Sequence, residues 1–163
     1  MKYYTEIHTS RKHFYIVAGT PESVRMSNAQ QIEEGKELLI DFDKIGKIGR
    51  KGYHVVPVAV QDFDTREVLQ IAYVNEEALR LSLAEARAVF FSTSRAQIWR
   101  KGETSGDILD LVEIRTNCEQ NSLLFLVRKR TPGSCHTRDM AGNHRGTCFY
   151  RRVLPENNLK FLD

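Results

Sequence analysis

The amino-acid sequence predicts an α+β fold: one antiparallel-β-rich domain with a single main helix. Short apolar runs rich in β-branched residues recur from residue 55 onward, and turn-forming segments separate them, which is typical of strands joined by hairpins. Only one longer segment, which follows Asn75, has the start signal and the Ala and Leu pattern of a packed helix. A length of 163 residues and a hydrophobic fraction of 41% fit one ordinary globular domain.

The first two apolar runs, 55–61 and 68–74, flank a turn that is rich in aspartate, and this arrangement predicts a β-hairpin. Within the turn, Asp62 and Asp64 are interpreted as turn-forming side chains rather than as a metal pair. Asn75 follows as the N-cap of the main helix, which is expected to end near Arg87.

Four further apolar runs predict strands. The sequence SLLFLV, within 122–129, is apolar on both faces and therefore predicts a central strand. The other predicted strands are 89–93, 108–115 and, as the last one, 148–153.

The chain is expected to divide into an N-terminal extension (1–38), a main domain (39–154) and a short polar tail (155–163) that begins at Pro155.

Signals before the main run of strands are weaker. Residues 13–18 predict a short strand and residues 27–37 a weak helix. Residues 41–52 are rich in Gly and Lys and predict a loop.

Composition and charge exclude several classes of partner. Lys and Arg number 24 and Asp and Glu 21, so the formal charge of +3 is too small to indicate a nucleic acid, and an anionic small molecule suits it equally well. No apolar run approaches the roughly 18 residues that cross a bilayer, and the N-terminus lacks the apolar stretch of a signal peptide. We therefore expect a cytoplasmic protein that binds neither nucleic acid nor membrane.

The segment 92–106, STSRAQIWRKGETSG, concentrates groups that bind an anionic nucleotide. Its cationic side chains donate charge-assisted hydrogen bonds to phosphate, its glycines let the backbone approach a ligand, and its tryptophan can stack on a base. A charged loop exposed to solvent explains the same composition. The candidate substrate-binding residues are Arg95, Trp99, Arg100, Lys101, Gly102, Glu103, Thr104 and Ser105.

The three cysteines, Cys118, Cys135 and Cys148, all lie in the last third of the chain, at predicted strand ends or turns. An odd number in a reducing compartment does not indicate a disulfide framework. Three thiolates leave zinc one open position for water, so the set predicts a catalytic zinc site, with free buried cysteines as the alternative. His136 directly follows a candidate ligand and is the predicted catalytic base, and His144 competes for that role.

Several motifs occur in one order along the chain: VVPVAVQDFDTREVLQIAYVNEEAL, FFSTSRAQIWRKGETSG, the cysteine of RTNCEQNSLLFLV, CHT and CFYRR. Together they resemble the phosphoribosyl-AMP cyclohydrolase family of histidine biosynthesis over roughly residues 39–152. The resemblance implies a zinc-dependent hydrolase that opens the adenine ring of N1-(5′-phosphoribosyl)-AMP between N1 and C6. It also implies a homodimer with shared active sites, in which Cys118 comes from one chain and Cys135 and Cys148 come from the other.

Around the first cysteine the sequence departs from the family. The family pattern Asp-Cys-Asp-x-Asp binds magnesium, whereas the three matching positions here are Asn117, Glu119 and Asn121. Magnesium relies on carboxylates, so a single carboxylate predicts weak or absent binding at this degenerate site. A plain polar turn is the alternative.

A second departure separates Cys135 from Cys148. Twelve residues stand between them, several more than in the family. The added stretch is expected beside the zinc, where it is either a harmless loop or brings Arg138, His144 or Arg145 to a different substrate. Two other functions therefore stay open: a divergent member acting on another purine nucleotide, and a zinc-stabilised module that binds a nucleotide without turnover.

Overall fold

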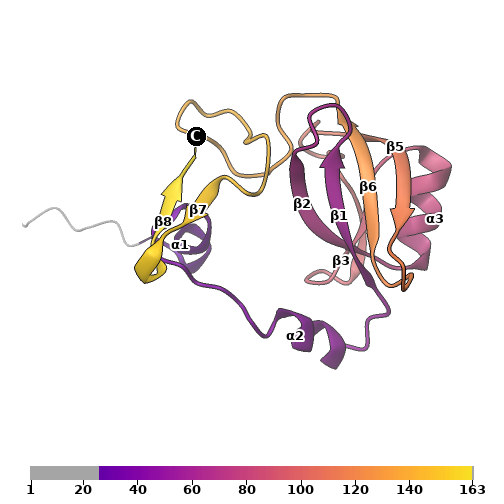
Figure 1. The fold of residues 1–163 in the computed structure, drawn as a ribbon, viewed down its shortest axis with the longest axis horizontal. Helices are drawn as coiled ribbons and strands as arrows, with labels where there is room; N and C mark the ends of the chain where they lie inside the picture. The colour runs from indigo at the N-terminus through magenta and orange to yellow at the C-terminus, as the bar shows by residue number, and fades with distance from the viewer. Residues whose placement is uncertain (1–25, 163) are drawn as a thin grey trace, which may run out of the picture.

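The computed structural model describes residues 26–162, and its main sheet has four strands in the order β2-β1-β6-β5 (Figure 1). These strands are β1 (Val56–Asp62), β2 (Val68–Val74), β5 (Leu109–Thr116) and β6 (Leu123–Lys129). The predicted α+β class, the first hairpin and the central position of β6 are confirmed. The two central strands, β1 and β6, pair in parallel, however, so the sheet is mixed rather than wholly antiparallel.

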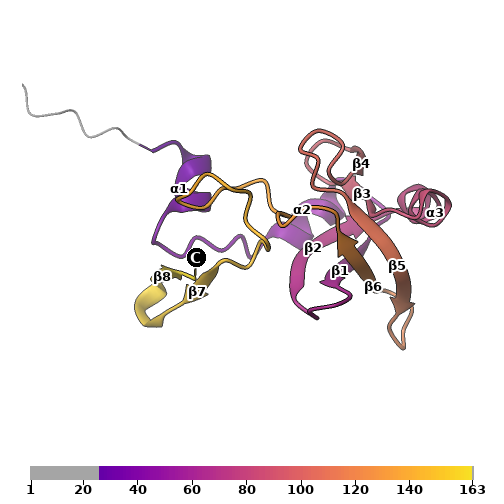
Figure 2. The same ribbon diagram turned by 90° about the horizontal axis from the view of Figure 1, so that it is seen from above.

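The main helix, α3 (Glu76–Glu85), follows β2 and begins as predicted. The Asn75 side chain accepts a hydrogen bond of 2.9 Å from the Ala78 backbone N–H, which satisfies one of the free donors of the first turn. After α3 the chain forms a hairpin of β3 (Val89–Ser92) and β4 (Gln97–Arg100). Figure 2 shows this hairpin and α3 beside the curved main sheet. The core lies where these layers meet and includes Val58, Val60, Leu69, Phe90, Leu109, Phe125 and Val127, all fully buried.

Ser82 ties α3 to β3 inside this core. Its fully buried hydroxyl donates to the Ala78 carbonyl (2.8 Å) and accepts a hydrogen bond of 3.0 Å from the Val89 backbone N–H. We expect Ser82→Ala to lower the free energy of unfolding by about 2 kcal/mol, because the buried Val89 N–H loses its acceptor. Urea unfolding measures this change, and Ser94→Ala, at an exposed serine, is the control. Equal stability of the two variants would contradict the prediction.

The segment predicted as a loop over 41–52 contains a helix instead, α2 (Lys44–Arg50). Its two glycines disfavour a helix, but local ion pairs offset that preference. Lys47 contacts Asp41 at 2.9 Å, and Arg50 contacts Asp43. Ile48 is also buried, so the short helix gains contact with the rest of the protein.

The C-terminal segment also differs from its prediction. The last predicted strand, 148–153, is regular only as β7 (Arg151–Val153), and the segment expected to be a polar tail forms a short 3-10 helix (Pro155–Asn157) and β8 (Leu159–Phe161). β8 pairs with β7, and the Phe161 ring stacks on the Tyr150 ring at 6.1 Å. These contacts depend on partners distant in sequence, which the polar composition of the tail does not reveal.

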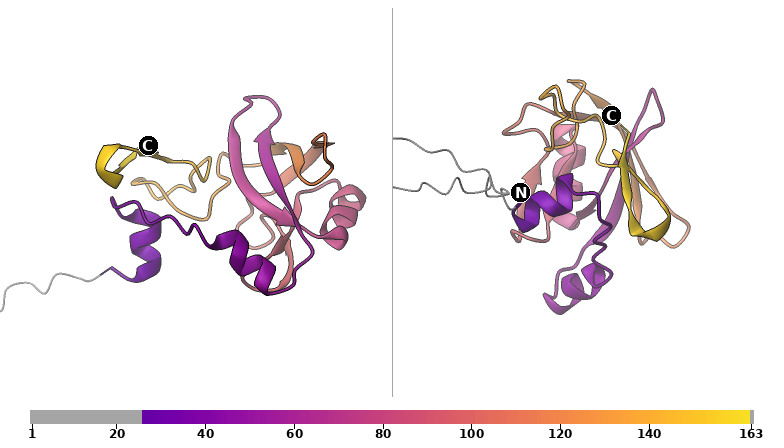
Figure 3. Two further views of the ribbon diagram at one scale, coloured as in Figure 1. Left: turned by 60° about the horizontal axis from the view of Figure 1, so that its bottom comes forward. Right: turned by 90° about the vertical axis from the view of Figure 1, so that its left-hand side faces the viewer.

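The β7–β8 hairpin and α1 (Asn28–Glu34) lie together at one side of the main sheet (Figure 3). α1 confirms the predicted weak helix and starts with a capping box between Ser27 and Gln30. Tyr150 donates through its hydroxyl to the Glu33 carbonyl (2.8 Å), which binds α1 to the C-terminal segment. The strand predicted at 13–18 lies outside the described residues. Over residues 26–162, no helix is long and apolar enough to cross a membrane.

Candidate active site

The predicted nucleotide-binding segment, 92–106, is divided between the β3–β4 hairpin and the turn that follows it. Gly106 donates its N–H to the Gly102 carbonyl at 2.8 Å, and both glycines have a positive φ, +82° and +81°. This tight turn leaves the intervening Glu103, Thr104 and Ser105 exposed. The predicted substrate-binding residues therefore do not all form one surface that a ligand can reach.

The cationic side chains of this segment have different environments. Arg95 is exposed in the β3–β4 turn. The Arg100 guanidinium binds Glu85 of α3 at 2.8 Å, and this contact holds the pKa of the carboxyl below its usual range. Trp99 is partly exposed and packs on Phe90, with ring centroids 5.5 Å apart.

Lys101 is buried, unlike a surface lysine that binds phosphate. Burial lowers the pKa of its ammonium group, while the charges of Asp107, Cys148 and Cys135 oppose that shift. Lys101 therefore places the WRKGETSG motif beside two of the three cysteines.

Cys135 and Cys148 lie next to each other. Cys135 donates its backbone N–H to the Arg145 carbonyl (2.9 Å), and Cys148 donates to the Leu69 carbonyl at the start of β2 (2.7 Å). A hydrogen bond with the Cys148 side chain lowers the pKa of Cys135 to about 5, and the same contact raises the pKa of Cys148. The Thr137 hydroxyl, 3.1 Å from the Cys135 sulfur, further favours the thiolate. The pair can thus supply a thiolate ligand near neutral pH.

Cys118 lies at the opposite end of the sheet. It is exposed in the turn between β5 and β6, whereas Cys135 follows the far end of β6. Seven strand residues span roughly 20 Å, so the third thiol cannot reach the other two within one chain. Within residues 26–162, one chain brings no three His, Cys, Asp or Glu side chains together as a metal site.

The three residues of the predicted degenerate magnesium site lie around Cys118 and bind one another. Asn117 donates through its side-chain amide to Asn121 at 2.8 Å, and Asn121 donates to Glu119 at 2.8 Å. Asn117 Oδ1 also accepts hydrogen bonds from two backbone N–H groups of the turn. Their oxygens thus serve the turn itself, as expected for the polar-turn interpretation.

The two histidines considered as the base have different surroundings. His136 is largely exposed, and its Nε2 lies 2.8 Å from Oε1 of Glu33 on α1. The His144 side chain is only 18% exposed, and its Nδ1 lies 2.5 Å from Oδ2 of Asp107.

Asp107, which directly follows the WRKGETSG motif, is buried. Burial alone would raise the pKa of its carboxyl, but hydrogen bonds from Thr131, Ser105 and His144 lower that pKa below its usual value. The Thr131 hydroxyl donates to Oδ1 at 2.8 Å. Sequence analysis missed Asp107 and Glu33, since nothing in the sequence signals that Asp107 meets a histidine 37 positions later.

The long interval between Cys135 and Cys148 folds into an ordered loop. Arg138 donates to the Gly142 carbonyl at 2.6 Å, and Arg145 is buried against Glu34 of α1 at 2.8 Å, with its guanidinium 4.1 Å from the Tyr150 ring centroid. The loop therefore has defined contacts on the α1 side.

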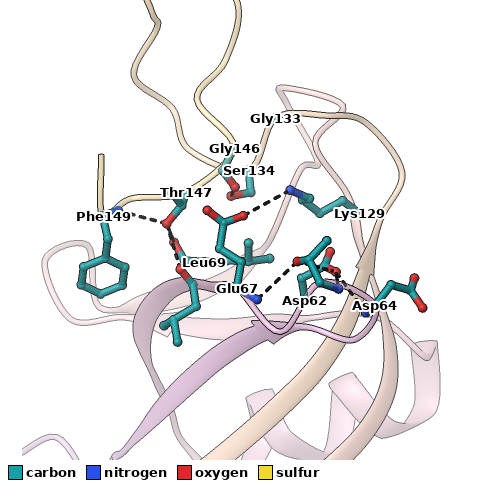
Figure 4. Close-up of polar contacts among 12 residues, drawn as sticks. Asp62, Asp64, Glu67, Leu69, Lys129, Gly133, Ser134, Gly146, Thr147 and Phe149 are labelled. Atoms are coloured by element: carbon teal, nitrogen blue, oxygen red, sulfur yellow. Dashed lines mark hydrogen bonds and ion pairs between the residues drawn. The ribbon is translucent and has the colours of Figure 1, made fainter. Parts of the chain in front are cut away.

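The end of the loop is fixed to the main sheet (Figure 4). Thr147 donates to the Val68 carbonyl (2.8 Å), and Ser134 donates to the Gly146 carbonyl (2.6 Å). Nearby, Lys129 of β6 contacts Glu67 at 3.9 Å.

A cavity of about 840 Å³ lies between this loop and the end of the sheet. Its walls include Asp107, Thr131, Gly133, His144 and Thr147. A volume of this size suits a nucleotide-sized ligand. The structure thus brings together Lys101, the Cys135–Cys148 pair and the Asp107–His144 pair, and leaves Cys118 and its turn apart.

Comparison with known proteins gives a consistent result. The family model described as phosphoribosyl-AMP cyclohydrolase matches residues 70–150. A phosphoribosyl-AMP cyclohydrolase of Brucella anthropi is 40% identical over 132 residues, which are 80% of this chain and 84% of the relative. One from Archaeoglobus fulgidus is 46% identical over 99 residues, or 61% of this chain and 85% of the relative. A histidine biosynthesis bifunctional protein of Caldanaerobacter subterraneus is 41% identical over 113 residues, 69% of this chain and 50% of that protein.

Proposed function

This chain belongs to the phosphoribosyl-AMP cyclohydrolase family, and we propose on that basis that it is a zinc-dependent hydrolase of N1-(5′-phosphoribosyl)-AMP in histidine biosynthesis. The reaction opens the adenine ring between N1 and C6. The observation that carries this proposal is the buried Lys101 of the candidate substrate-binding motif: its ammonium group contacts the Asp107 carbonyl at 3.4 Å, and the charges of Cys135 and Cys148 act on it. A thiolate pair beside an anion-binding motif suits a metal-assisted hydrolysis of a phosphorylated substrate.

The donor set fits zinc. Cys135 is poised as a thiolate by its neighbours Cys148 and Thr137, and thiolates are ligands that zinc prefers. We propose Cys135, Cys148 and a third thiolate, Cys118, as the ligands. When bound, the ion would lower the pKa of a coordinated water toward neutrality and so supply hydroxide.

The position of Cys118 supports a homodimer with shared sites. Its sulfur lies at one end of the sheet and the other two ligands at the opposite end, roughly 20 Å away, so a complete set requires a second chain. A two-fold axis that places Cys118 of one chain near the Cys135–Cys148 pair of its partner builds two equivalent sites.

Within each site the chain's own residues bind the substrate. We propose that Arg95 and the exposed turn of Glu103, Thr104 and Ser105 contact its phosphates and riboses, and that Trp99 offers an apolar face to a ring. Arg100 acts in this account by fixing β4 to α3 through Glu85. The turn of Asn117, Glu119 and Asn121 is already satisfied internally, so we expect no strong magnesium requirement.

The ordered loop between Cys135 and Cys148 favours one alternative, a related purine nucleotide as substrate. Residues of this loop, including Arg138, Asn143 and His144, line the 840 Å³ cavity, so the loop is placed to change which nucleotide fits. A binding module without turnover is less consistent with a paired thiolate set, since binding alone needs no open metal position.

Purified full-length protein, in the reducing medium expected of the cytoplasm, tests these proposals directly. We expect about one zinc per chain by elemental analysis, in line with one three-thiolate site per chain. We also expect turnover of phosphoribosyl-AMP, followed by the change in ultraviolet absorbance as the purine opens. Full activity without metal would contradict the zinc proposal, and a zinc-loaded protein that is inactive on this substrate would favour a different nucleotide.

A further inference from the structure

The Asp107–His144 pair is a buried carboxylate with a histidine at the wall of the candidate substrate cavity. We propose that His144 is the residue that moves protons in the ring-opening reaction, and that Asp107 positions it. This inference rests on the proposed function. It concerns a side chain in the long interval between Cys135 and Cys148, the part of the sequence that departs from the family pattern.

The hydrogen bonds around His144 define which of its two ring nitrogens is free to accept a proton. Asp107 also accepts from the Thr131 hydroxyl and, with its carboxyl held below its usual pKa, is ionised near neutral pH. A carboxylate only accepts hydrogen bonds, so Nδ1 of His144 carries the proton that it shares with Asp107. Nε2 then carries the free lone pair of the neutral ring. A general base needs this tautomer, with the second nitrogen held by a carboxylate.

The packing around the pair restricts its movement. A Cβ atom on Gly133 would lie 2.6 Å from Cβ of His144 and 3.1 Å from Oδ1 of Asp107, so the chain at Gly133 is in close contact with both residues. Backbone bonds also link the neighbouring Arg145 to the segment that carries Cys135: its carbonyl accepts from the N–H groups of Ser134 and Cys135. His144 is therefore held firmly, and the residue next to it, Arg145, fixes Cys135.

His136 has the weaker geometry for this role. Its side chain is 76% exposed, and its Nε2 is already bound to Glu33 of α1. A side chain that is mostly in solvent is less firmly prepositioned against a substrate than the largely buried His144. We infer that His136 instead fastens the start of the loop to α1.

The proton transfers balance as follows, starting from the neutral imino form of the adenine ring. The oxygen of water forms a bond to C6 while Nε2 of His144 accepts one proton of the water and the exocyclic nitrogen takes the other. The C6–N1 bond then breaks and N1 takes the proton from Nε2, while the oxygen becomes the carbonyl of the carboxamide. The two protons of water thus end on the exocyclic nitrogen and on N1, and His144 returns to its neutral form.

The test uses full-length protein and substitutions that separate the two ring nitrogens. In His144→Asn, the side-chain amide takes the place of Nδ1 and can still donate to Asp107, but the group corresponding to Nε2 is lost. We expect kcat to fall by about 100-fold, the lower end of general-base effects, with KM changed by less than about threefold. Imidazole added to His144→Ala should restore part of the activity, which also shows that the variant is folded. His54→Asn, at an exposed histidine on another part of the surface, is the matched control and should keep wild-type activity.

Asp107→Asn tests the positioning role. The charged residues that line the cavity with His144 are Asp107, Glu67 just before β2, and Arg138, Asp139 and Arg145 in its own loop. Removing the Asp107 charge should lower kcat while KM changes by less than about threefold, because the imidazole loses the carboxylate that holds its ring, and Asp107→Glu should restore part of kcat. A purely structural role would lower the amount of folded protein without this split between kcat and KM.

The possible outcomes are distinct. If wild-type protein turns over phosphoribosyl-AMP and His144→Asn keeps full kcat, the inference about His144 is wrong and the proposed function stands. If His136→Asn loses activity while His144→Asn does not, His136 is the base. If zinc-loaded wild-type protein has no turnover, the proposed function fails, and the assignment of His144 fails with it.

Discussion

Combining a Cys118→Ser chain with a Cys135→Ser chain in one dimer should restore activity that neither variant has alone. Each homodimer should lose turnover by on the order of 100-fold or more, because even changes behind a metal ligand lower affinity or activity by about 10- to 100-fold. In the heterodimer, the unchanged Cys118 of one chain meets the unchanged Cys135 and Cys148 of the other. One of two sites is then complete, so kcat per dimer should be about half of the wild-type value.

Co-expression with two different affinity tags isolates the heterodimer for this measurement. The matched control pairs Cys135→Ser with Cys148→Ser, both at the same end of the sheet. In that heterodimer each site keeps a defective thiol, so no activity should return. A purified Cys118→Ser/Cys135→Ser heterodimer without activity would exclude sites shared in this way, as would recovery in the control.

The parts of the fold that sequence patterns predicted are those with local causes. The first hairpin follows from two β-branched runs around an Asp-rich turn, and Asp62 in fact accepts hydrogen bonds from the N–H groups of Asp64 and Thr65. α3 follows from its Asn75 cap. The central strand β6 follows from its unbroken apolar run, which is buried from Phe125 to Val127.

Elements that depend on distant partners were not predictable in the same way. β8 forms because Leu159 donates its N–H to the Lys36 carbonyl (2.7 Å) and Phe161 stacks on Tyr150. The parallel pairing of β1 and β6 joins residues such as Val58 and Leu123, which no local signal connects. Propensity is a weak guide wherever tertiary contacts decide the conformation.

The candidate site likewise combines features that the sequence indicates with features that only the structure reveals. Residue types alone made candidates of the three cysteines and of the motif around Lys101, because thiols can bind zinc and glycine-rich basic turns can bind phosphate. The structure added the contacts between side chains: Arg100 forms an ion pair with Glu85, and Asp107 binds His144. Neither pair has a sequence spacing that would reveal it.

Gly102→Ala should be the most disruptive single substitution in the WRKGETSG motif. Gly102 has a φ of +82°, a conformation that costs residues with a side chain about 1–2 kcal/mol. A Cβ atom there would also lie 2.4 Å from the backbone C of Asp107 and N of Ile108. That backbone leads directly into the fully buried Leu109, so it cannot move aside cheaply. We expect a loss of about 3 kcal/mol in the free energy of unfolding.

The same substitution should lower kcat, because a displaced Asp107 no longer positions His144. Gly52→Ala is the matched control: its φ is +68°, but nothing lies within 4 Å of the added Cβ, so only the conformational cost of about 1 kcal/mol applies. Urea unfolding of both variants with equal m-values isolates the difference in stability. Equal losses of unfolding free energy in Gly102→Ala and Gly52→Ala would mean that the backbone at Asp107 moves to make room for the added Cβ. The Asp107–His144 pair would then be held only by its contacts with Thr131 and Gly133.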